Sequence, residues 1–119
     1  MPRFRLRTVR WYGIVLGGGA LLLPCAFAQA QTPDPAQLAE GKLLFQKQAN
    51  PACATCHTLK DAGSTGAIGP NLDDTGPSKD DIRGVLHSGL GAMPQFDDHL
   101  SKDQIDALVN YVFWATHPH

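Results

Sequence analysis

Two cysteines and a histidine stand close together in the segment Cys53-Ala54-Thr55-Cys56-His57. Two residues separate the cysteines and the histidine follows at once, which is the spacing of a c-type haem attachment site. One turn of chain aims both thiols at the two vinyl groups on one edge of a porphyrin, so Cys53 and Cys56 are predicted to carry thioether bonds. His57 then reaches the iron as its proximal ligand. The segment therefore predicts one covalently attached haem c.

A Cys-x-x-Cys pair alone has two other interpretations, a thioredoxin-like dithiol and a zinc-binding knuckle. The adjoining His57 favours the haem interpretation over both. A haem-free dithiol or zinc module stays as an alternative, and a thioether-linked haem that remains with the denatured chain would distinguish them.

Met93 is the candidate for the second axial ligand. The chain has only two methionines, and Met93 lies in a Gly-flanked loop 36 residues after His57, enough chain to pass around the ring and return on its other face. A thioether paired with an imidazole gives low-spin iron of raised potential. Such a centre favours electron transfer over chemistry at an open site. The other interpretation is a methionine that fills a gap in the core.

The loop between the two candidate ligands contains Gly69-Pro70-Asn71-Leu72. The carbonyl of Pro70 is predicted to accept a hydrogen bond from the free imidazole N–H of His57, which fixes the tautomer that binds iron. Leu72 is predicted to press on the porphyrin. By spacing alone this stretch is only a turn.

The N-terminus has the pattern of a cleaved secretory signal. Four arginines in residues 1–10 precede an uncharged apolar stretch, and small residues follow near Ala28 and Ala30. We predict a signal peptide over residues 1–28, with cleavage after Ala28 or Ala30, and a flexible leader over 29–35. The alternative is an uncleaved N-terminal anchor. The signal predicts a periplasmic protein with no stable membrane span after processing.

The chain that remains after cleavage is acidic and small. It keeps six lysines and arginines and all eleven acidic residues, a net charge of −5 with neutral histidines. No basic patch is present, so nucleic acid is excluded as an expected partner. A domain of this size is short of core, and a flat apolar cofactor would supply interior.

Three helices are expected around the motif. Asp34 and Pro35 open one over residues 36–48, Ser78 opens a second that ends at Gly89, and a Ser101 capping box opens a third that runs to about residue 115. Residues 58–75 are expected to form a loop. Gly41 costs its helix about 1 kcal/mol relative to alanine. Either another helix crosses there at close range, or the glycine is tolerated on the surface.

These motifs together resemble the class I (monohaem) c-type cytochromes of the bacterial periplasm. The resemblance covers about residues 36–115, and the predicted cytochrome c domain spans residues 36–117. It implies an all-α cytochrome c fold of three to four short helices, in which the N- and C-terminal helices cross near Gly41 beside Phe45 and Tyr111. It implies His57 and Met93 as the metal ligands. The loops 59–72 and 91–96 are also similar to small haem subunits or acceptors of sulfite dehydrogenases.

The predicted function is one-electron transfer between Fe(II) and Fe(III). The expected redox partners are a periplasmic dehydrogenase and a terminal oxidase or another cytochrome, and the resemblance of the loops points to a sulfite dehydrogenase as the dehydrogenase. No nucleophilic triad, paired carboxylates or phosphate-binding loop is apparent, so we predict no independent catalysis. The alternative is a gas-binding or peroxidatic haem protein in which Met93 is displaceable.

Overall fold

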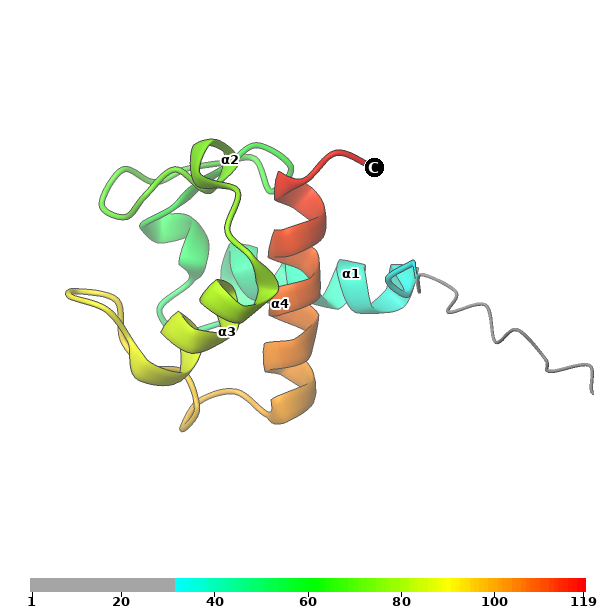
Figure 1. The fold of residues 1–119 in the computed structure, drawn as a ribbon. Coiled ribbons are helices and arrows are strands. Elements are labelled where there is room, and N and C mark those ends of the chain that lie inside the picture. The colour runs from blue at the N-terminus through cyan, green and yellow to red at the C-terminus, as the bar shows by residue number, and fades with distance from the viewer. Residues whose placement is uncertain (1–31) are drawn as a thin grey trace, which may run out of the picture. The chain divides into compact units, whose positions relative to one another are not determined.

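The computed structural model describes residues 32–119; the predicted signal peptide lies outside them. The described chain is mainly helical (Figure 1), and its buried apolar residues form one core. Among the described residues, no helix has both the length and the apolar character needed to cross a membrane. The elements in chain order are α1 (Pro35–Leu43), a π-helical turn (Leu44–Gln48), a 3₁₀ turn (Cys53–Thr55), β1 (Thr58–Leu59), β2 (Ser64–Thr65), α2 (Leu72–Thr75), α3 (Lys79–Ser88) and α4 (Lys102–Thr116).

Helix α1 begins as predicted and ends differently. The carboxylate of Asp34 accepts a hydrogen bond of 3.0 Å from the Ala36 amide, and Pro35 occupies the first helical position. The predicted continuation to residue 48 is a π-helical turn, in which the Ala49 amide bonds to the carbonyl of Leu44 five residues back. The wider turn lets the neighbouring side chains of Leu44 and Phe45 both become buried.

Helices α1 and α4 cross at Gly41, as the sequence predicts (Figure 1). A Cβ atom built on Gly41 would come within 2.5 Å of the Tyr111 Cβ and closer still to the Ala107 carbonyl oxygen. Only hydrogen fits between these two backbones. The rings of Phe45 and Tyr111 meet edge to face beside the crossing, with centroids 6.2 Å apart.

The prediction of an irregular loop over residues 58–75 was incomplete. Strands β1 and β2 pair antiparallel around a turn in which Gly63 has a φ of 65°. Asn71 then caps the single turn α2 by accepting a bond from the Asp73 amide at 3.1 Å. Two-residue strands and a one-turn helix are too short to produce a periodic pattern, which explains why the sequence did not reveal them.

The two remaining helices have the predicted capping residues. Ser78 and Asp81 form a capping box at the start of α3, and Ser101 and Gln104 form one at the start of α4. Gly89 follows α3 with a φ of 66°, a conformation that glycine adopts without strain. The loop between Gly89 and Ser101 carries Met93.

Candidate functional site

An apolar cavity of about 420 Å³ lies between the Cys53–His57 segment, the loop before α2, helices α3 and α4, and the loop that carries Met93. This volume is within the range of small-molecule and cofactor sites. Apart from the predicted sulfur and imidazole groups, Thr75 and Asp81 supply the only polar side chains of its lining. All six residues predicted from the sequence line it: Cys53, Cys56, His57, Pro70, Leu72 and Met93.

The 3₁₀ turn brings the three residues of the motif to the same cavity. The amides of Cys56 and His57 both donate to the carbonyl of Cys53, at 3.1 and 2.9 Å. This tight turn places both thiols and the imidazole along one wall. Burial raises the pKa of the Cys53 thiol to about 11, so that thiol stays protonated near neutral pH.

His57 is held by the loop that precedes α2. Its Nδ1 lies 2.9 Å from the carbonyl oxygen of Pro70. Because a carbonyl oxygen only accepts, Nδ1 must carry the proton, and Nε2 of the neutral ring is then free to bind a metal. Only glycine fits at the adjacent position 69, because a Cβ atom there would lie 2.5 Å from Cε1 of the His57 ring.

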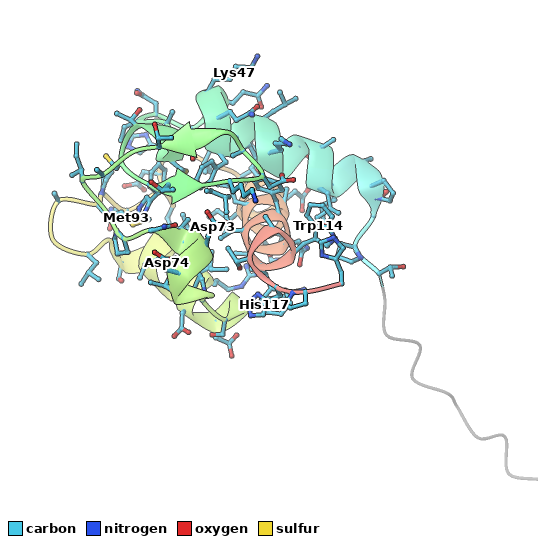
Figure 2. All side chains as sticks on the ribbon, turned by 90° about the horizontal axis from the view of Figure 1, so that it is seen from above. Lys47, Asp73, Asp74, Met93, Trp114 and His117 are labelled. Carbon is cyan, nitrogen blue, oxygen red and sulfur yellow. The ribbon has the colours of Figure 1, made fainter. Side chains whose placement is uncertain are left out.

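Met93 reaches the cavity from a tight reverse turn. The amide and carbonyl of Leu90 bond to the carbonyl and amide of Met93, each at 3.0 Å, and Gly91 between them has a φ of 58°. A Cβ on Gly89 would come within 2.7 Å of the Met93 carbonyl oxygen, so Gly89 also lets this turn close. Figure 2 shows Met93 on the loop after α3, on the side of the molecule away from Trp114.

The structure adds lining residues that the sequence did not assign to a site. Helix α3 contributes Ile82, Val85 and Leu86. Ile68 and Leu90 line the cavity yet are 74% and 72% exposed, so they stand at its opening. No spacing pattern relates these residues, because they come from three separate segments.

The cavity residues fit a haem c. They combine two thiols on one wall, an imidazole whose Nδ1 faces the Pro70 carbonyl, a thioether and an otherwise almost wholly apolar lining. Cys53 and Cys56 would hold the porphyrin covalently, and His57 and Met93 would bind the iron.

The chain matches known cytochromes in sequence and structure. Residues 36–112 match the family model described as cytochrome C oxidase, cbb3-type, subunit III. The chain is 29% identical over 79 residues to cytochrome c-551 of Halorhodospira halochloris, covering 61% of this chain and 94% of that protein. It is 33% identical over 93 residues to cytochrome c6 of Cladophora glomerata, covering 67% and 90%.

The crystal structure of the c-type cytochrome SorU from Sinorhizobium meliloti superposes with a TM-score of 0.67 at 35% identity. The match covers 70% of this chain and 94% of that one. The chain therefore belongs to the matched family, as a monohaem class I c-type cytochrome with a covalently attached haem c and its iron. The predicted family, cofactor and all-α cytochrome c fold are confirmed.

Proposed function

We propose that this cytochrome is a periplasmic one-electron carrier between a dehydrogenase and the respiratory chain, without catalysis of its own. One observation carries the proposal: His57 and Met93 line the same apolar cavity, and Nε2 of His57 is free to bind a metal. When bound, the haem supplies the Fe(II)/Fe(III) couple. The protein supplies the ligands, the dry surroundings and the surface that partners contact.

The contacts around both ligand residues favour electron transfer over an open site. Pro70 holds the His57 ring through a backbone carbonyl, and the Leu90 pairing holds the Met93 turn. The His57 ring and the backbone of the Met93 turn are therefore held by hydrogen bonds within the protein. The buried ring of Phe96 lines the same cavity as Met93 and helps to exclude water.

The opening of the cavity suggests how partners dock. Residues 50–56, 62–72 and 88–96 contain no aspartate, glutamate, lysine or arginine. Within these segments Ile68 and Leu90 project into solvent. We infer that redox partners contact this uncharged rim mainly through apolar surface, in the small and brief contacts typical of electron transfer.

The dehydrogenase that we propose as the donor is a sulfite dehydrogenase, because loops 59–72 and 91–96 resemble those of small haem subunits or acceptors of such enzymes. The proposed acceptor is a terminal oxidase or another cytochrome. The predicted signal over residues 1–28 supports a periplasmic location.

The proposal is tested by exporting the full chain in a host with haem-attachment machinery. We expect a pyridine haemochrome spectrum of one haem c per chain and a peroxidase-stained band on a denaturing gel. The ferric protein should show the long-wavelength absorption band of sulfur-ligated iron and bind carbon monoxide slowly when reduced. Absence of that band together with fast carbon monoxide binding would favour the gas-binding or peroxidatic alternative. A colourless chain would favour a dithiol or zinc module.

A further inference from the structure

The loop that carries Met93 is closed at its base by two contacts between its ends. The Phe96 amide donates a 2.8 Å hydrogen bond to the carbonyl of Leu86 in the last turn of α3. One residue further along each segment, Nδ1 of His87 meets a carboxylate oxygen of Asp97. The backbone bond and the side-chain pair are adjacent, and together they tie the two ends of the segment 87–97.

The charged neighbours of this pair have other partners. Arg83, one turn earlier on α3, bonds to Asp106 of α4 at 2.6 Å. Asp98, next to Asp97, accepts a bond from Gln95 at 3.2 Å. The contact between His87 and Asp97 is therefore specific, and it connects a helix end to the far side of the Met93 loop.

The side chains of His87 and Asp97 are 47% and 45% exposed. A pair this open to water contributes little to global stability. Its position gives it a local role, since the Leu90–Met93 pair makes the only described backbone hydrogen bonds of residues 90–95, while Gly89 and Phe96 at the ends of that stretch bond to Val85 and Leu86 of α3.

We propose that His87 and Asp97 are positioning residues that hold the Met93 loop closed over the cavity and so keep the thioether in place. This rests on the proposed role of Met93 as an iron ligand. When the pair is broken, the loop opens more often, and an added ligand such as imidazole displaces the thioether more readily.

The test is imidazole titration of the ferric, haem-loaded protein, followed by loss of the long-wavelength band. Asp97→Asn and His87→Gln should each strengthen imidazole binding by about 1.5- to fivefold, the range expected from one exposed pair. The double variant should bind no more tightly than the stronger single variant, because both changes break one contact. Asp98→Asn removes a neighbouring charge and should leave imidazole binding unchanged.

Urea unfolding separates positioning from general destabilisation. The Asp97→Asn unfolding midpoint should match that of Asp98→Asn, while only Asp97→Asn binds imidazole more tightly. Equal imidazole binding by the two variants would overturn the inference.

Met93→Ala separates the two proposals: if it binds imidazole no more tightly than the unmodified chain, Met93 is not the ligand and the proposed function fails. If it binds far more tightly but Asp97→Asn does not, only the role of the pair is wrong.

Discussion

The hydroxyl of Tyr111 donates a 2.7 Å hydrogen bond to Asp61, fifty residues earlier in the chain. Tyr111 is buried on α4, and Asp61 lies in the turn between β1 and β2. Lys42 of α1 contacts the same carboxylate oxygen at 3.1 Å. This one carboxylate therefore links both crossing helices to the hairpin that follows the haem motif.

Replacing Asp61 tests this link through its pH dependence. Partial burial on its own would raise the pKa of Asp61, but the bonds from Tyr111 and Lys42 outweigh it and lower that pKa below 3.8. The ionised Asp61 carboxylate therefore stabilises the fold above the ordinary pKa of an aspartate. This stabilisation is lost as the pH falls through the lowered pKa. We expect Asp61→Asn to lose about 1 kcal/mol of unfolding free energy at pH 7 and progressively less below pH 3.8. Urea unfolding at several pH values measures this loss of stability. Glu40→Gln, which changes an exposed acid, is the control. A loss that does not depend on pH would contradict the prediction.

Gly41 and Gly84 form a matched pair for testing the helix crossing. Alanine at Gly41 would overlap Tyr111 and Ala107, and we expect a loss of about 1–3 kcal/mol despite the better helix propensity. Alanine at Gly84, on α3, meets nothing within 4 Å and should gain about 0.4–1 kcal/mol. Urea unfolding of both haem-loaded variants checks the contrast. Equal effects would mean that the crossing is not tight.

Gly69→Ala should disturb the proposed iron ligand His57. The new methyl group would overlap the imidazole ring and weaken the hydrogen bond between Nδ1 and Pro70. Loss of a hydrogen bond that orients a metal-binding histidine reduces metal affinity about 10–100-fold. We expect less haem per chain and easier loss of the histidine ligand on acidification, measured by haemochrome content and absorption spectra. Ile68→Ala, which alters the exposed neighbour, should retain full haem content.

Met93→Ala should lower the reduction potential by on the order of 0.1 V, a fraction of the ~0.8 V that axial ligands span. Loss of the thioether removes the ligand that favours ferrous iron, and it leaves a coordination position for carbon monoxide. Spectroelectrochemical titration measures the potential. Leu90→Ala, in the same turn, should leave it unchanged. An unaltered potential and spin state in Met93→Ala would show that another group binds the iron.

The uncharged rim predicts how electron transfer responds to mutation and salt. Ile68→Ala and Leu90→Ala should each slow electron transfer from the donor about fivefold, because each removes apolar contact worth about 1 kcal/mol. The reduction potential should stay unchanged. Leu43→Ala removes an exposed leucine from α1 that does not line the cavity, and should have no effect. Stopped-flow rates at several ionic strengths should change little. A steep fall with added salt would instead assign docking to charged residues outside the rim.

The sequence by itself determined the features that depend on neighbours within a few residues. These are the Cys-x-x-Cys-His motif and the helix starts at Asp34, Ser78 and Ser101, because capping and haem attachment act over two to four positions. Gly41 also signalled a close crossing, since a glycine within a helix has a conformational cost that close packing can explain.

Only the tertiary structure decided which distant segments meet. The Tyr111–Asp61 bond and the His87–Asp97 pair join separate segments, and neither leaves a spacing pattern in the chain. The same holds for the contribution of α3 to the cavity wall. Such contacts are set by how the helices pack around a common core, and an apolar stripe in the sequence shows that a face is buried without showing what covers it.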